Sequence, residues 1–280
     1  MAIDRFIPQV WSAKLLSELR KALVYGQPEV VNRDYEGDIA AAGDCVKIHG
    51  IGAVTVCDYV KNADLPAPQT LSDEEQTLMI DQAKAFNFAI DDIDAAQQTP
   101  KLMTEAMADA AYRLAEIADR YIAAQHAQAG GRLGSDGAPV TAGKDNAYDL
   151  LVDMATLLSE QNAPQAGRWV VVPPWFHGLL LKDARFTGTG GAAAERMLKN
   201  GAIGMAAGFV VLESNNVPAE DGKCKILAGV PAAWSYAEQV AEMNAYRPEK
   251  RFADAVKGLH VYGAKVVKPD ALVCMTAVKA

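Results

Sequence analysis

The sequence predicts an α+β fold in which an N-terminal arm and an extended two-stranded loop precede one long straight helix. Three observations support this prediction. A short amphipathic segment is preceded by residues, Met1–Gln9, that have little apolar material to pack on. Stretches with strand-like character enclose a polar segment with two prolines. A helical pattern of unusual length comes next, and alternating apolar residues near the C-terminus indicate returning strands.

The 280 residues carry a formal net charge of −8, and half of them are hydrophobic. This composition is typical of a folded protein with a sizeable core. An acidic chain is not expected to coat nucleic acid, because that function needs clustered lysine and arginine. No apolar run approaches the ~18 residues that span a bilayer, and the N-terminus lacks the apolar stretch of a signal peptide. We therefore expect a soluble chain made in a reducing cytoplasm, with buried thiols at Cys45, Cys57, Cys224 and Cys274.

The N-terminal arm is expected to contain one short helix. Ser12 is a suitable N-cap, apolar residues follow at helical spacing, and Gly26 with Pro28 ends the pattern. Too little apolar sequence surrounds this helix for it to be stable alone. We therefore expect residues 1–43 to form an arm that finds its partner surface elsewhere, often on another subunit.

Residues 44–90 are expected to form the extended loop. Its strand-like runs are residues 45–49, 53–59, 75–80 and 85–90. Gly-Ile-Gly at 50–52 is a hairpin signal between the first two runs, and residues 62–70 form a polar tip. A lone hairpin of this length is only marginally stable in water, so we expect it to lie on another surface.

The strongest helical pattern covers residues 99–127. Thr99 is placed to cap this helix, and Pro100 occupies its first position. One apolar stripe runs along it, formed by Met103, Met107, Ala110, Leu114, Ile117, Ala118, Tyr121 and Ile122. At ~1.5 Å per residue the helix spans roughly 40 Å, which is long for a chain of this size and favours a rigid strut.

The remainder of the chain is expected to mix helices and strands. Helices are predicted at 146–161 and 174–181, and strands at 169–172, 209–213, 225–229 and within 259–278. A flexible loop is predicted at 130–141, and residues 231–258 form a mixed region without a clear pattern.

Charge is distributed unevenly along the chain. Residues 64–92 contain seven acidic residues and one lysine, whereas residues 245–269 contain six basic and two acidic residues. These segments could pair between neighbouring subunits; the alternative is two solvated faces that never meet. Together with the arm, they supply the candidate assembly residues Trp11, Arg20, Lys21, Asp64, Asp73, Glu74, Glu75, Arg247, Lys250 and Arg251.

No motif in the sequence predicts an enzyme. The four histidines do not form a zinc signature, and no nucleophile elbow occurs. Asp91, Asp92 and Asp94 are the best candidates for a metal or acid–base site, because three close carboxylates can hold Mg²⁺ or Ca²⁺. Aspartate is also favoured at turns and helix entries for local hydrogen-bonding reasons. We therefore expect no catalytic residue, no cofactor and no metal.

Four stretches of the chain resemble the major capsid (coat) protein of tailed double-stranded-DNA bacteriophages. They are FIPQVWSAKLLSELRKALV at 6–24, VVNRDYEGDIAAAGDCVKI at 30–48, FAIDDIDAAQ at 88–97 and FADAVKGLHVYGAKVVKPDALVCM at 252–275. Their order and spacing extend the resemblance over essentially the whole chain. The resemblance implies an arm at 1–43, an extended loop at 44–90, a peripheral domain with the spine helix at 91–144 and 259–280, and an axial domain at 145–258.

The resemblance also implies a function. Such a chain would assemble as hexamers and pentamers into an icosahedral head in the host cytoplasm, and would become part of the virion. It would enclose double-stranded DNA without binding a specific sequence, and would not contact a membrane. Its partners would be itself, a portal protein and, in some relatives, a separate scaffold and a decoration protein. The alternative is an encapsulin-like compartment shell, which has a related fold; an enzyme that uses the three aspartates is a third hypothesis.

Overall fold

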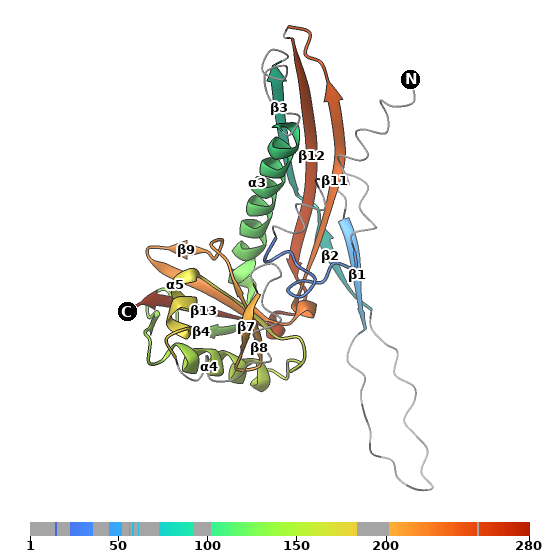
Figure 1. Ribbon diagram of the computed structural model, residues 1–280. Helices are drawn as coiled ribbons and strands as arrows, with labels where there is room; N and C mark the ends of the chain where they lie inside the picture. The colour runs from blue at the N-terminus through green and yellow to red at the C-terminus, as the bar shows by residue number, and fades with distance from the viewer. Residues whose placement is uncertain are drawn as a thin grey trace.

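The computed structural model describes residues 15, 23–35, 45–51, 56, 58, 61, 73–91, 102–183, 202–250 and 252–280. Within these residues the chain forms an eight-stranded sheet, a three-stranded sheet and a two-stranded hairpin. Figure 1 shows the eight-stranded sheet in a compact unit at one end, with the long helix α3 and the three-stranded sheet extending away from it. The predicted α+β class is confirmed.

The compact unit is built on strands in the order β4-β13-β10-β6-β8-β7, while β5 pairs with β13 and β9 pairs with β10. The strands are β4 Gly131–Leu133, β5 Val140–Ala142, β6 Trp169–Val172, β7 Ala202–Ala206, β8 Phe209–Glu213, β9 Ala219–Glu220, β10 Lys223–Gly229 and β13 Leu272–Lys279. The helices α4 (Ala147–Glu160) and α5 (Pro174–Leu180) belong to the same unit. The predicted helices and strands of this region are therefore confirmed to within a few residues. The flexible loop predicted at 130–141 is wrong at both of its ends, where β4 and β5 pair with β13.

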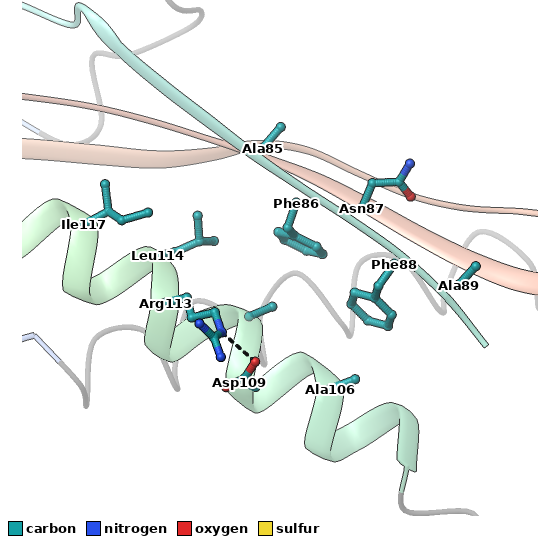
Figure 2. A pocket seen from close by; sticks show the side chains of 11 residues that line it. Ala85, Phe86, Asn87, Phe88, Ala89, Ala106, Asp109, Arg113, Leu114 and Ile117 are labelled. Carbon is teal, nitrogen blue, oxygen red and sulfur yellow. Dashed lines mark hydrogen bonds and ion pairs between the residues drawn. The ribbon is translucent and has the colours of Figure 1, made fainter.

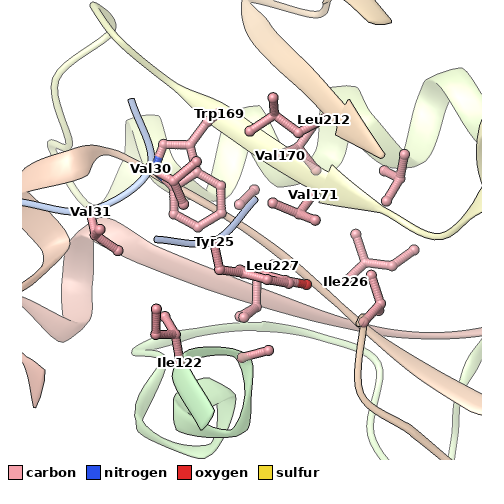
Figure 3. Close-up of a cluster of buried hydrophobic side chains, with 14 of the residues drawn as sticks. Tyr25, Val30, Val31, Ile122, Trp169, Val170, Val171, Leu212, Ile226 and Leu227 are labelled. Atoms are coloured by element: carbon pink, nitrogen blue, oxygen red, sulfur yellow. The ribbon is translucent and has the colours of Figure 1, made fainter. Parts of the chain in front are cut away.

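The central strands of the eight-stranded sheet are apolar on both faces. All four residues of β6 and the first six of β13 are buried. Strands that are covered on both sides form continuous apolar runs rather than alternating ones. Figure 3 shows Trp169 and Val171 of β6 in one cluster with Tyr25 of the arm and Ile122 of α3. The main core therefore joins the compact unit to both the arm and the long helix.

The elongated sheet contains β11 (Trp234–Tyr246), β12 (Ala253–Val266) and β3 (Gln82–Asp91), all antiparallel to their neighbours. β11 was not predicted, since residues 231–258 showed no clear pattern. Its sequence places Glu238 at a buried position, and its pairing shifts register between Val240 and Glu242. An internal charge and a bulge both break the alternation by which a strand is recognised.

The long helix α3 (Leu102–Ala124) runs beside the elongated sheet (Figure 1) and ends in the 3₁₀ turn η2 (Gln125–Gln128). Its buried face consists of Met107, Ala111, Leu114, Ala115, Ala118, Ile122 and Ala123. These positions recur at the spacing of one helix face. Its 23 residues span about 35 Å. The predicted long helix is confirmed here, while Thr99 and Pro100 lie outside the described residues. The predicted apolar stripe is wrong at Ile117, which is 41% exposed.

The two-stranded hairpin pairs β1 (Cys45–Ile51) with β2 (Asp73–Met79), and the partners run from Cys45↔Met79 to Ile51↔Asp73. The predicted turn at 50–52 is wrong, because Gly50 and Ile51 continue β1. Val46, Ile48 and Leu78 of the hairpin instead pack with Ala237 of β11 and Val261 of β12 in a small second core. Burial of these apolar side chains outweighs the local turn preference of the glycines.

The hairpin is held close to β12 at Gly263. A Cβ atom at this position would lie 2.1 Å from the carbonyl oxygen of Met79 and 3.1 Å from Cα of Ile80. We expect Gly263→Ala to lower the free energy of unfolding by about 1–3 kcal/mol, because the backbone must move to admit the methyl group. Urea unfolding should show no comparable loss for Gly178→Ala, where the added Cβ meets nothing within 4 Å. An unchanged stability of Gly263→Ala would contradict this close approach.

The sheets do not follow the predicted domain borders in every strand. β11 comes from the segment predicted as axial but pairs with β12. β13 comes from the segment predicted as peripheral but pairs with β10. The predicted roles of the four segments remain predictions.

Two further findings concern the predicted burial of the cysteines and the predicted lack of a bilayer-spanning segment. Cys224 and Cys274 are buried as expected, but Cys45 is exposed, and Cys57 lies outside the described residues. Among the helices that the structure describes, none has both the length and the hydropathy required to cross a bilayer.

Candidate assembly surfaces

The described part of the arm packs against its own subunit. Leu15, Leu23, Tyr25, Val30 and Val31 are each at most 1% exposed and belong to the main core. The expectation that the arm finds its partner surface on another subunit is therefore wrong for these residues.

Asp119 of α3 anchors this segment of the arm. Its carboxylate oxygens accept hydrogen bonds from the backbone N–H groups of Val24 at 2.8 Å, Tyr25 at 3.1 Å and Gly26 at 3.2 Å. Asp119 is fully buried. Burial raises the pKa of Asp119 to about 7, against the opposing effect of these three hydrogen bonds and of one from the Asn216 side chain. One buried carboxylate thus joins the arm, the long helix and the turn that follows β8.

A second buried group connects the arm to the elongated sheet. Arg33 donates to Glu238 on β11 and, at 2.7 Å, to the carbonyl oxygen of Gly26. Glu238 also accepts from the hydroxyl of Tyr236 at 2.7 Å and lies 3.2 Å from Nε2 of His260 on β12. Glu238 and His260 are at most 4% exposed. This network therefore fixes residues 26–33 against two strands of the sheet.

The charge of Glu238 is stabilised by its neighbours. Burial raises the pKa of Glu238, but hydrogen bonds and charges from His260 and Arg33, together with the hydroxyl of Tyr236, outweigh burial and hold the pKa at about 2. Glu238 is therefore ionised throughout the neutral range, as an ion-pair partner of Arg33 must be.

Aromatic stacking joins the two large sheets at the same place. Trp169 of β6 and Trp234 of β11 stack with ring centroids 5.4 Å apart and planes within 10°. Nε1 of Trp234 donates to the carbonyl oxygen of Val30 at 2.7 Å, and Tyr25 meets Trp234 edge-on at 6.3 Å. The arm therefore completes the joint between the compact unit and the elongated sheet.

The acidic candidate residues lie on the β1–β2 hairpin. Asp73 and Glu74 begin β2, opposite the end of β1. Glu75 forms an exposed ion pair with Lys47 at 2.7 Å. Exposed pairs of this kind contribute little to stability, so the carboxylate of Glu75 is available for contacts with other molecules. Asp64 lies outside the described residues, as do Trp11, Arg20 and Lys21 of the arm.

The basic candidate residues lie at the tip of the β11–β12 hairpin. Arg247 and Lys250 are in the connection between the two strands, where Arg247 is 3.9 Å from Asp254. The neighbouring Phe252 is 84% exposed, and Tyr246 contacts the ammonium group of Lys257 at 5.6 Å. This tip combines positive charge with exposed aromatic surface. Arg251 lies outside the described residues.

The hairpin and the basic tip are separated within one subunit. β2 leads into β3, whose first residue, Gln82, is opposite Tyr262 and whose last, Asp91, is opposite Ala253 at the tip. The ten residues of β3 alone span about 30 Å at ~3.3 Å per residue. Figure 1 shows the β1–β2 hairpin beyond the other end of β3. Asp73, Glu74 and Glu75 are therefore too far away to meet the basic tip of the same subunit.

An apolar groove of about 540 Å³ lies between β3 and α3. Figure 2 shows Phe86 and Phe88 pointing from the strand toward the helix, with their rings stacked 5.9 Å apart. At its edge Arg113 and Asp109 form an ion pair at 2.8 Å. Both phenylalanines are partly buried and pack against the main core.

The aspartate cluster receives no support as a metal site. Asp91 ends β3, whereas Asp92 and Asp94 lie outside the described residues. Among the residues that the structure does describe, no group of three or more histidine, cysteine or carboxylate side chains is placed to hold a metal ion.

Sequence reasoning missed Asp119 and the Arg33–Glu238 pair. A signal was present for Asp119, because it lies next to Ala118 on the buried stripe of a helix, where an unpaired carboxylate is unfavourable. The sequence did not indicate its partners, because these are backbone amides 93 to 95 residues away.

The chain matches the phage capsid protein family over residues 74–275. No curated protein matches it. Among solved structures, one from Mycobacterium phage Che8 is 32% identical, with a TM-score of 0.69 and 90% of each chain covered. The capsid structure of cyanophage P-SCSP1u is 18% identical, with a TM-score of 0.68 over 93% of this chain and 90% of the other.

A virus-like particle from Pyrococcus furiosus shares the fold at 12% identity, with a TM-score of 0.56 over 95% of this chain and 98% of the other. The family match and the Che8 structure confirm the resemblance that the four sequence stretches indicated. This chain therefore belongs to the phage capsid protein family, as a protein of the capsid shell.

Proposed function

We propose that this capsid protein assembles as hexamers and pentamers into the icosahedral head that encloses phage double-stranded DNA. One observation supports the proposal beyond family membership. Asp73, Glu74 and Glu75 of the β1–β2 hairpin and the basic β11–β12 tip lie beyond opposite ends of β3, so these charges cannot pair with each other within one subunit. Complementary charges that are separated in this way can pair between copies of the chain.

The remaining partners belong to the same proposal. A portal protein, a separate scaffold and a decoration protein would contact the assembled shell in the host cytoplasm. The formal charge of −8 supports a lumen that encloses DNA without gripping it. Residues 1–43, 44–90, 91–144 with 259–280, and 145–258 are proposed to act as arm, extended loop, peripheral domain and axial domain.

The direct test is to express the full chain, sediment it and image the fast fraction by negative-stain electron microscopy. Closed uniform icosahedral shells, or tubes of the same lattice, are the expected result. A chain that stays monomeric when scaffold and portal proteins are supplied would contradict the proposal.

The likeness to the Pyrococcus furiosus particle favours an encapsulin-like shell as the second candidate. A single co-purifying cargo protein inside the shells would support that candidate instead.

The first part of the arm is expected to act in assembly rather than in folding. Deleting residues 1–14 removes Trp11 but keeps Leu15 and residues 23–35 in the core. The shortened subunit should keep the melting temperature of the full chain and fail to form regular shells in sedimentation and microscopy. Deleting residues 1–25 is the contrasting case, because it removes Leu15, Leu23 and Tyr25 and should destabilise the subunit itself. Regular shells from the shorter deletion would contradict this role.

Reversing the charge of the β1–β2 hairpin should weaken assembly. The variant Asp73→Lys, Glu74→Lys and Glu75→Lys would face the basic tip of a neighbour with like charge. The yield of shells should fall, and it should fall most at low salt, where exposed charges are least screened. A control with the same change in net charge is Asp145→Lys, just before α4, together with Asp153→Lys and Glu160→Lys on α4, all three at exposed positions. Equal yields from both variants at every salt concentration would mean that the hairpin is simply solvated.

A further inference from the structure

A small polar pocket of about 180 Å³ lies in the compact unit, apart from the surfaces described above. It is formed by η2, β4, the loop that follows β4, and the strands β10 and β13. Its polar lining consists of His126, Arg132, Ser135, Asp136, Lys225 and Thr276. Arg132 and Lys225 carry positive charge, against the single carboxylate of Asp136, in a chain of net charge −8.

Lys225 is the central residue of the pocket. It is only 6% exposed, although it lies on β10 directly opposite Thr276 of β13. Its ammonium group donates to Asp136 and, at 3.1 Å, to Oγ1 of Thr276. An ammonium group has three N–H donors, so these contacts leave one for a further acceptor. A buried ammonium group needs strong compensation, and Asp136 compensates only in part because its side chain is 71% exposed to solvent.

Positive charge exceeds negative charge around the pocket. Lys223 and His126 lie close enough to Asp136 to act on it electrostatically, and Arg132 acts on Cys274 in the same way. A guanidinium N–H of Arg132 donates to the carbonyl oxygen of Ala127 at 2.7 Å, which holds the group at the pocket. In the described part of the chain, Asp136 is the only carboxylate that lines this space. A concave site with excess positive charge attracts anions.

Two hydroxyl groups complete the set of donors. Oγ1 of Thr276 accepts from Lys225, and Oγ of Ser135 accepts from the backbone N–H of Ala138 at 3.2 Å. Each hydroxyl can still donate its own proton. An ammonium, a guanidinium and two hydroxyl groups around one small space match the acceptors of a tetrahedral oxyanion.

We propose that this pocket binds a phosphate group, with Lys225 and Arg132 as the charged donors and Ser135 and Thr276 as the neutral ones. The bound group competes with Asp136 for the ammonium of Lys225. Removing the charge of Asp136 therefore strengthens binding, and removing the charge of Arg132 weakens it. This opposite response of two neighbouring residues distinguishes a phosphate site from an ordinary surface ion pair.

The test is a calorimetric titration of the full chain with inorganic phosphate, at an ionic strength kept constant with chloride. We expect saturable binding that weakens about tenfold in Arg132→Gln, the effect of one charge-assisted hydrogen bond. Asp136→Asn should bind more tightly than the wild-type chain. The control is Arg120→Gln, which removes an exposed arginine of α3 paired with Glu116 and should bind like the wild-type chain. Absence of saturable binding, or equal weakening in both arginine variants, would overturn the proposal.

A second titration distinguishes the two sources of a phosphate group. A fluorescently labelled DNA duplex is added to the same variants, and inorganic phosphate is then used as a competitor. Binding of the duplex that is weakened by Arg132→Gln and displaced by phosphate identifies the nucleic-acid backbone as the source. Saturable binding of phosphate without binding of the duplex identifies the free anion, and both results support the site. Neither measurement requires assembled shells, so the outcome is independent of the proposed assembly.

Discussion

Replacing Asp119 by alanine is expected to lower the free energy of unfolding by about 3 kcal/mol or more. The buried backbone amides of Tyr25 and Gly26, and the partly buried amide of Val24, would lose their acceptor. Each buried donor without a partner costs about 1–3 kcal/mol. The matched control is Asp109→Ala on the same helix, since Asp109 is exposed and paired only with Arg113. Chemical denaturation should show less than about 1 kcal/mol for the control, and a similar small loss for Asp119→Ala would contradict the anchoring role.

The same residue predicts the pH dependence of stability. The folded subunit holds a proton on Asp119 up to about pH 7, whereas an unfolded aspartate releases its proton near pH 4. Between these values the folded state binds more protons, so the contribution of Asp119 to stability falls as the pH rises from 4 to 7 and is constant above. The slope is about 1.4 kcal/mol per pH unit. Subtracting the profile of Asp119→Asn from that of the wild-type chain isolates this contribution. A flat difference between pH 4 and 7 would show that the pKa of Asp119 is not raised.

Removing Glu238 is expected to have the other large effect. Glu238→Ala removes the carboxylate of the Arg33–Glu238 ion pair, in which the Arg33 side chain is only 10% exposed. Breaking one partner of a buried ion pair typically costs about 3–5 kcal/mol. Replacing both partners, as in Arg33→Met with Glu238→Leu, should recover most of that loss because no uncompensated charge stays buried. The exposed Lys47–Glu75 pair provides the comparison, and Glu75→Ala should cost less than about 1 kcal/mol in the same assay. Equal losses for the two single variants would contradict the buried role of Glu238.

The parts of the fold that were predicted correctly are those that local pattern determines. The buried stripe of α3 follows a 3.6-residue period. The apolar run of β6 is only four residues long, which is too short for a buried helix and therefore indicates a strand. The hairpin turn at 50–52 failed for the opposite reason. Its glycines favour a turn locally, but β1 continues through them to pair with a strand that begins 22 residues after Ile51. Val46 and Ile48 are then buried against β11 and β12. Pairing over that distance cannot be recognised from neighbouring residues.

Of the candidate assembly surfaces, the sequence predicted only those formed by runs of like-charged residues. The acidic and basic segments are visible in the sequence because like charges follow one another. The structure places Asp73, Glu74 and Glu75 on the β1–β2 hairpin and Arg247 and Lys250 at the β11–β12 tip. The two segments still meet elsewhere, since Asp91 ends β3 opposite Ala253 and Lys265 donates to the carbonyl oxygen of Thr77. Asp119 and Glu238 are single charges within apolar surroundings. What makes them important is burial together with partners far along the chain, and both follow from tertiary packing. The docking of residues 23–35 was missed for the same reason.

The stacked pair Trp169 and Trp234 affects how precisely the far end of the elongated sheet is positioned. The stack joins this sheet to the compact unit, so the angle at this joint determines where the far ends of β11 and β12 lie. The 13 residues of β11 extend about 43 Å from it at ~3.3 Å per residue. A tilt of ~5° at this joint would therefore displace the far end of β11 by about 4 Å, more than the length of a hydrogen bond. A subunit that forms contacts with identical neighbours through the far end of this sheet requires a rigid joint. Two stacked tryptophans, a buried ion pair and the anchored arm lie together at the joint.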